Sequence, residues 1–181
     1  LVCASERDLF MDEKSLEILE FPEIRRKLAE YTSFSASREL VLGLKPIADY
    51  QTISLWLKQS GEARHLITVN PGFTIGQAAD IRETAKMAAL GKIIEPLDLI
   101  DCRRTLAVLR QVRSSLSSIS KEVPLLWEIA EDITELPEVE KEINHCLSPT
   151  GEVLDRASRN LEGIRRQLGE MRHALREKLE A

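Results

Sequence analysis

Leu161-Glu-Gly-Ile-Arg-Arg-Gln-Leu-Gly-Glu-Met-Arg-His-Ala-Leu175 is the stretch that decides the fold class of this chain. Its apolar residues recur at alternating steps of three and four, the heptad pattern of a helix that packs along a partner helix. No Gly, Asn or Pro stop signal follows before Ala181. We therefore expect an unfinished coiled-coil arm whose partner lies in a longer chain; docking of the helix on its own body is the alternative. The apolar positions are called the seam: Leu161, Ile164, Leu168, Met171 and Leu175.

The rest of the chain also has helical periodicity, and strand-like alternation is rare. Proline is tolerated in the first turn of a helix, so Pro22, Pro96, Pro124 and Pro137 each predict a helix start. Further helix boundaries are predicted from Asp49, Asp80 and Ser158 as N-caps and from Gly43 as a left-handed C-terminal residue. The predicted helices cover residues 12–31 (broken at Pro22), 33–42, 49–69, 80–90, 96–119 and 137–146.

One segment is predicted to be extended. Residues 145–147 and 152–154 flank Ser148-Pro149-Thr150-Gly151, which has the composition of a tight turn, so a small two-stranded hairpin is expected here. The predicted fold class is therefore all-α, a multi-helix bundle with one small β-hairpin and a long C-terminal arm helix. The expected divisions are a disordered leader at residues 1–10, a helical bundle at 11–157 and the start of the arm at 158–181.

Composition excludes several classes of protein. The chain has 181 residues, 43% of them hydrophobic, and no apolar run near the length that spans a bilayer. Three isolated cysteines, Cys3, Cys102 and Cys146, favour free thiols and a cytoplasmic location. The net charge of −5 argues against nucleic-acid binding by bulk attraction. Charge is segregated, however: residues 121–155 hold two basic and ten acidic side chains, whereas residues 156–181 hold seven basic and four acidic ones.

No catalytic, cofactor or metal site emerges from the motifs. The glycines are single and none precedes Lys-Ser or Lys-Thr in the spacing of a phosphate-binding loop. His145 and Cys146 would point to opposite faces of a strand and could not share a metal. Cys102 lies among the apolar positions of its helix, where a small buried hydrophobe is the expected role. The carboxylate pairs read as solvated helix faces.

The basic residues of the last helix are the candidate binding residues. Two interpretations stay open: a solvated flank of a coiled coil, or contact with phosphates or an acidic partner. Aromatic residues do not alternate with these cations, so stacking of unpaired bases is not indicated. The set consists of Arg159, Arg165, Arg166, Arg172, Arg176 and Lys178.

The order of several short motifs resembles a known family. It begins with Met11-Asp-Glu-Lys-Ser-Leu-Glu-Ile-Leu-Glu-Phe-Pro-Glu-Ile24 and continues with Leu40-Val-Leu-Gly-Leu-Lys-Pro46, Glu62-Ala63, Asp80-Ile-Arg82 and Gly91. Gly151-Glu-Val-Leu-Asp155 then stands directly before the arm, which is the most specific element. From Met11 to the end, the chain resembles the N-terminal part of bacterial MutS-type ATPases of the second branch, which lack a mismatch-reading domain and usually end in an Smr domain.

The resemblance implies a function and partners. The parent protein would be a dimeric, DNA-dependent ATPase with endonuclease activity, acting in recombination control or repair on DNA, or in rescue of stalled ribosomes. ATP and Mg would bind in an ATPase domain absent from this chain, which itself would hold no cofactor. This chain would be a non-catalytic part of the core or lever domain that couples ATP-driven motion to a nucleic-acid clamp, with the returning arm helix elsewhere in the parent. A free-standing helical interaction module with a C-terminal coiled coil is the alternative.

Overall fold

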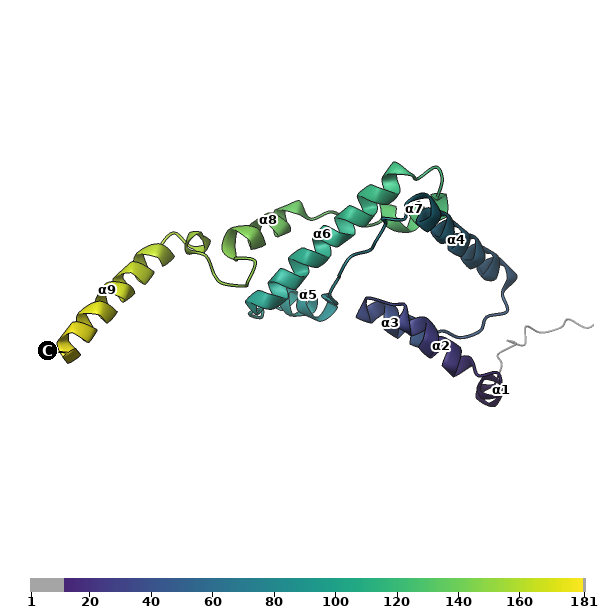
Figure 1. Cartoon of the computed structure of the whole chain (residues 1–181), viewed down its shortest axis with the longest axis horizontal. Helices are drawn as coiled ribbons and strands as arrows, with labels where there is room; N and C mark the ends of the chain where they lie inside the picture. Colours follow the sequence, from purple (N-terminus) through teal and green to yellow (C-terminus); the bar gives the residue numbers. More distant parts are fainter. Residues whose placement is uncertain (1–11, 181) are drawn as a thin grey trace, which may run out of the picture. The chain divides into compact units, whose positions relative to one another are not determined.

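Residues 12–180 are described by the computed structural model, and they form nine α-helices and one short 3-10 helix without a strand (Figure 1). The predicted all-α fold class is therefore confirmed. The expected leader, residues 1–10, lies outside the described residues. The helices are α1 (Glu13–Ile18), α2 (Phe21–Glu30), α3 (Ser35–Leu42), α4 (Tyr50–Val69), α5 (Arg82–Ala89), α6 (Pro96–Ser118), α7 (Pro124–Glu131), α8 (Pro137–Cys146), η1 (Asp155–Ala157) and α9 (Leu161–Glu180).

Local signals set most of the helix starts. Pro96, Pro124 and Pro137 are the first residues of α6, α7 and α8, as predicted. Asp49 caps α4 as predicted, because its carboxylate Oδ2 accepts a hydrogen bond from the Thr52 N–H at 2.7 Å. Asp12 caps α1 in the same way, with 3.1 Å between Oδ1 and the Ser15 nitrogen. A side chain that satisfies these otherwise unpaired N–H groups fixes the boundary locally.

At three predicted helix boundaries the structure differs from the prediction. Gly43 ends α3 in a right-handed conformation with φ −84°, and its N–H bonds to the Glu39 carbonyl at 2.9 Å, so no left-handed cap is needed. Helix α5 is preceded by Ile81 as its N-cap residue and not by Asp80, and no side chain caps it. Helix α9 begins at Leu161, three residues after the expected cap Ser158.

The predicted hairpin is reduced to one antiparallel bridge between Leu147 and Val153. His145 and Cys146 belong to α8, because the helical hydrogen-bonding pattern continues to Leu147, whose N–H bonds to the Ile143 carbonyl at 2.9 Å. The turn was placed correctly. Gly151 has φ +86°, a left-handed conformation in which a side chain is strained.

The described residues divide into two compact units, each with its own core. Unit 1 contains residues 12–80 and 108–135. Within it α2 packs on α3, and α4 packs on α7. Its core is formed by apolar residues from α4, from the second half of α6 and from α7 with the preceding turn: Leu66, Leu116, Val123 and Ala130.

Unit 2 contains residues 81–107 and 136–180. Its core joins Ile100 of α6 to Ile143 and Leu147 at the end of α8, and Cys102 and Cys146 pack against this cluster. Both α8 and α9 contact η1. The functional candidates on α9 are therefore attached to this unit through the bridge and η1.

Candidate coiled-coil and nucleic-acid interface on the last helix

The apolar seam of α9 is exposed over most of its length. The exposed fraction is 58% for Ile164, 46% for Leu168, 71% for Met171 and 61% for Leu175, whereas Leu161 is half-buried. A surface helix of a globular domain normally buries such a stripe against the body. The alternative interpretation, in which α9 docks on its own chain, is not seen among the described residues, and the helix presents an apolar stripe to solvent.

Arg165 is used to hold the first turn of α9 in place. Its guanidinium forms an ion pair with Asp155 of η1 and donates a hydrogen bond to the Val153 carbonyl at 2.8 Å. Arg156 similarly donates to the carbonyls of His145 and Asn144, at 2.9 and 3.0 Å, and so satisfies the end of α8. Of the candidate basic residues, Arg165 is therefore occupied by its own chain.

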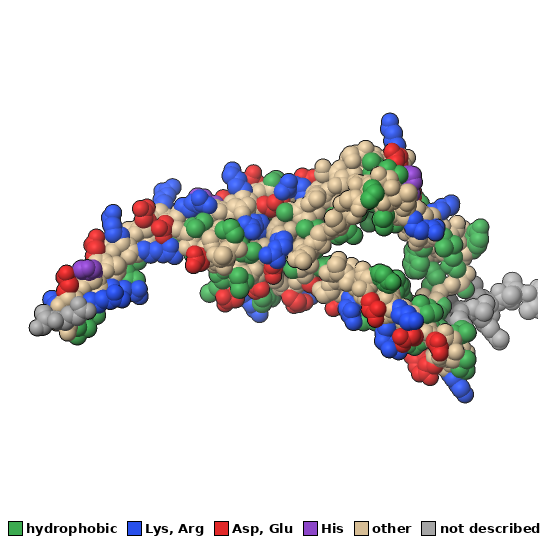
Figure 2. All heavy atoms as spheres, in the orientation of Figure 1, with side chains coloured by type: hydrophobic (Ala, Val, Ile, Leu, Met, Phe, Trp, Pro, Cys, Tyr) green, Lys and Arg blue, Asp and Glu red, His purple; other side chains and the backbone are tan. Residues whose placement is uncertain are grey.

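The other five candidate cations are exposed side chains. Figure 2 shows Lys and Arg side chains along the length of α9. Within the described part of the chain, none of the five forms a side-chain hydrogen bond or ion pair with another residue, so they remain available to a ligand. They are Arg159, Arg166, Arg172, Arg176 and Lys178. His173, also on α9, lies 3.5 Å from Glu177 and both side chains are exposed.

The heptad positions give the seam two chemically different edges. Arg165 and Arg172 directly follow the seam residues Ile164 and Met171, and Arg176 lies one turn beyond Arg172 on the same side. On the opposite edge, Gln167 and Ala174 directly precede seam residues and carry no charge. Arg166 lies on the side away from the seam. We call the first of these the arginine edge and the second the neutral edge.

Comparison with known proteins shows that the chain is similar to MutS2 endonucleases. It is 32% identical over 174 residues to endonuclease MutS2 of Geobacillus thermodenitrificans (strain NG80-2) and 33% identical over 173 residues to that of Geobacillus sp. (strain WCH70). Its homologues are MutS2 endonucleases. Putative endonuclease MutS2 of Bacillus subtilis (strain 168) is 30% identical over 174 residues. Each alignment covers 94% of this chain and 22% of the relative, so the chain spans about a fifth of the length of the curated relatives it matches.

No family model matches the chain. The similarity to MutS2 proteins confirms the predicted resemblance to the second MutS branch. The motif that supported this resemblance most specifically has a structural role here. Gly151 supplies the left-handed turn. The Val153 carbonyl and the Asp155 carboxylate accept hydrogen bonds from the Arg165 guanidinium, and these contacts join α8 to α9.

One cross-element contact was not visible in the sequence. Glu62 of α4 accepts hydrogen bonds from the N–H groups of Leu125 and Leu126, at 3.2 and 2.9 Å, and so caps the N-terminus of α7. The carboxylate satisfies two unpaired N–H groups and faces the positive end of the helix dipole. Because Glu62 precedes these partners by more than sixty positions, no local pattern could have revealed it.

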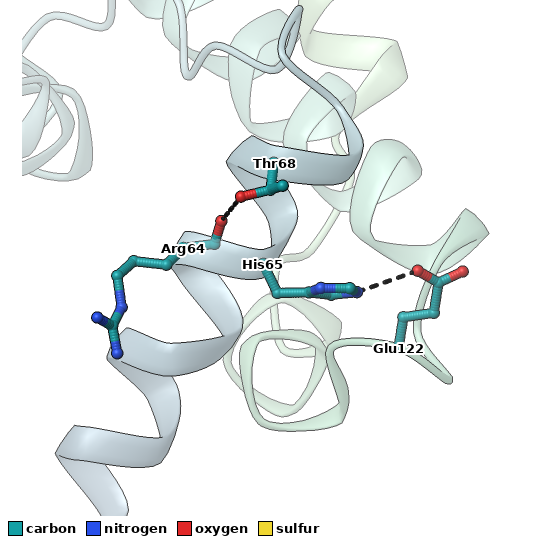
Figure 3. Close-up of polar contacts among 4 residues, drawn as sticks. All are labelled: Arg64, His65, Thr68 and Glu122. Carbon is teal, nitrogen blue, oxygen red and sulfur yellow. Dashed lines mark hydrogen bonds and ion pairs between the residues drawn. The ribbon is translucent and has the colours of Figure 1, made fainter.

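Near this cap, an exposed contact between His65 and Glu122 joins two segments of unit 1 (Figure 3). His65 Nε2 lies 3.4 Å from Glu122 Oε2, and both side chains are about half exposed. The Thr68 hydroxyl donates to the Arg64 carbonyl at 2.8 Å, inside the same helix, while the Arg64 side chain points to the other side of α4. An exposed pair of this kind contributes little to stability. It links α4 to the segment before α7 and supplies no further catalytic partner.

Three further features complete the survey of sites. An apolar groove of about 410 Å³ lies in unit 1 between α4, α6 and α7, with Leu66, Phe73 and Ile133 in its lining.

Burial, and then repulsion from the nearby carboxylates of Asp98 and Asp101, raises the pKa of the Cys102 thiol, which makes it a poor nucleophile. Within residues 12–180, no group of three or more His, Cys, Asp or Glu side chains could hold a metal ion, and no helix is long and apolar enough to cross a bilayer.

Proposed function

We propose that this chain is the first part of the helical lever of a MutS2-type protein, with α9 as the base of a coiled-coil arm. Two observations support the proposal: the similarity to MutS2 endonucleases over 94% of the chain and the exposed seam of α9. In this function residues 11–157 form the body of the lever and residues 158–181 the start of the arm. The chain performs no chemistry and transmits motion to a nucleic-acid clamp.

The activities of the whole protein follow from the same proposal. ATP and Mg bind in an ATPase domain outside this chain, and the returning arm helix also belongs to the parent. The parent is a cytoplasmic homodimer that acts on DNA or on the ribosome. The relatives are named as endonucleases, which supports a nuclease activity of the parent.

Transmission of motion requires that α9 be fixed firmly to the lever body. The contacts that support this are the ion pair of Arg165 with Asp155 and the hydrogen bonds of Arg156 to the end of α8. Together with η1 they tie three consecutive elements to one another. A rotation of the other elements of unit 2 is then passed to α9, in the manner of a rigid-body transition.

Fluorescence anisotropy tests the role of the basic residues. The chain is titrated with duplex DNA, a four-way DNA junction and structured RNA over a range of salt concentrations. We expect weak or no binding, and no ATP hydrolysis, because the nucleic-acid clamp and the ATPase domain lie elsewhere in the parent. Micromolar binding that weakens steeply with salt would instead show that the arm arginines contact phosphates and that this piece is part of the grip.

The gene itself distinguishes the proposal from the alternative of a free-standing helical interaction module. The codons that follow Ala181 are sequenced. An in-frame phosphate-binding loop of the ATPase type supports the lever, and a stop codon directly after Ala181 would contradict it.

A further inference from the structure

We infer that the partner helix of α9 carries Asp or Glu along the edge that faces Arg172 and Arg176. This inference rests on the proposed function and names the chemistry of the missing partner. The apolar seam alone accepts many helices. The charges beside it determine which helix is accepted, because residues at the edges of a coiled-coil seam form the interhelical ion pairs that set partner choice and orientation.

The first step is the asymmetry of the two edges. The arginine edge carries Arg165 and Arg172 beside the seam and Arg176 one turn further, whereas the neutral edge carries Gln167 and Ala174. Arg165 is already paired with Asp155. The charge offered to a partner is therefore concentrated in the distal half of α9, at Arg172 and Arg176, both of which are exposed.

The second step compares occupants. In an antiparallel pair of helices, like edges face each other, so a second copy of α9 would place its arginine edge against an arginine edge. In a parallel pair, opposite edges meet, and the arginines would face uncharged Gln167 and Ala174. Neither arrangement of two copies gains an interhelical ion pair. A helix with carboxylates on the facing edge gains one in either direction.

The third step concerns the charges within α9. Of its described acidic side chains, Glu170 and Glu177 lie away from the seam, and Glu177 contacts His173 instead. Glu162 lies on the same side of the helix as Arg176, but it precedes Arg172 by ten residues, about 15 Å along the helix, and so cannot pair with Arg172 or Arg176. The open cations at the arginine edge are therefore not neutralised by the helix itself among the described residues. Like charges facing each other are destabilising, so the same edge rejects basic partner helices and gives the seam selectivity.

The experiment compares two synthetic peptides that share a Leu-rich heptad seam and differ only at the positions facing Arg172 and Arg176. One peptide has Glu there and the other Lys. Binding of each fluorescently labelled peptide to the full chain is measured by anisotropy. Each exposed attraction or repulsion changes an equilibrium constant by a factor of about 1.5 to 2, so replacing two attractions by two repulsions multiplies four such factors and predicts about tenfold tighter binding of the acidic peptide at low salt. This ratio should approach one at about 1 M salt.

Two variants of the chain sharpen the result. The double variant Arg172→Glu with Arg176→Glu should reverse the preference and favour the Lys peptide. The matched control Arg159→Glu with Arg166→Glu makes the same change in net charge away from the arginine edge, and it should leave the ratio unchanged. A reversal produced equally by the control would show that only net charge matters, and the inference would be wrong.

The remaining outcomes separate this inference from the proposed function. If both peptides bind equally well at low salt, the seam accepts a helix as the lever proposal requires, but the acidic partner is excluded. If neither peptide binds, the seam is not a helix-pairing surface, and the inference fails together with the arm assigned in the proposed function. If Arg172→Glu with Arg176→Glu abolishes duplex DNA binding without altering the peptide ratio, these arginines contact phosphate and the inference is overturned.

Discussion

Replacing Glu62 by Ala should destabilise unit 1 by about 2 kcal/mol. The carboxylate accepts hydrogen bonds from two N–H groups in the first turn of α7. Loss of a side-chain cap costs about 0.5–2 kcal/mol, and a negative charge at a helix N-terminus contributes about 0.3–1 kcal/mol. Because the contact is half-buried, water replaces the lost acceptor only in part. Glu62→Gln keeps one oxygen acceptor and loses the charge, so about half of the destabilisation is expected.

Urea unfolding followed by the fluorescence of Trp127 reports on this contact, since Trp127 lies in α7 and packs against the core of unit 1. The second tryptophan, Trp56, is half exposed and is replaced by Phe in every variant so that one probe remains. Glu128→Ala, at an exposed position in the capped helix α7, is the matched control and should change the free energy of unfolding by less than about 0.5 kcal/mol. If Glu62→Ala were no more destabilising than Glu128→Ala, the cap would contribute nothing and the reasoning would be refuted.

Three further predictions concern other elements. Hydrogen bonds from the Thr52 side chain and N–H lower the pKa of Asp49 below 3.8, so its cap stabilises α4 fully above that pH and is lost as the pH falls through the lowered pKa. Asp49→Asn should remove this component of the acid-induced loss of helix, measured by circular dichroism between about pH 5 and pH 1. Because burial and neighbouring carboxylates raise the pKa of Cys102, alkylation by iodoacetamide in a Cys3→Ser, Cys146→Ser background should show an apparent pKa above 9.0, and Asp98→Asn should lower it. The exposed seam predicts weak self-association of the chain; Leu168→Glu should abolish it in sedimentation velocity, whereas Arg166→Glu should not, and unchanged association in Leu168→Glu would mean that the seam does not mediate it.

The sequence predicted the features of the fold that depend on neighbouring residues. Pro124 and Pro137 mark helix starts because the ring fixes φ and the missing N–H is not needed in the first turn. Asp49 caps α4 through a residue three positions away. Both signals act within a few residues, so a single sequence contains all the information that they require.

The predictions failed where the local sequence suits a helix and a strand about equally well, so that distant contacts decide between them. His145 and Cys146 were assigned both to the end of the predicted helix 137–146 and to a hairpin strand; the helix is confirmed and the strand was wrong, because Arg156 supplies donors to the carbonyls of His145 and Asn144. A side chain eleven residues downstream thus stabilises the helix end. The predicted seam is exposed in the structure, but the use of Arg165 by its own chain required the positions of η1 and the bridge.

The basic residues therefore differ in role according to their position along the chain. Arg156 and Arg165, close to η1 and the bridge, donate to backbone carbonyls or to Asp155, and these contacts fix α9 to the rest of unit 2. Arg172 and Arg176 lie about two turns further along, where the described structure offers them no acceptor, and the exposed seam runs beside them. A helix that is fixed at its base and unpaired beyond it is suited to carry the motion of the unit into a second helix. Selectivity for that second helix then depends on Arg172 and Arg176, because Arg165, the proximal member of the arginine edge, is already paired with Asp155.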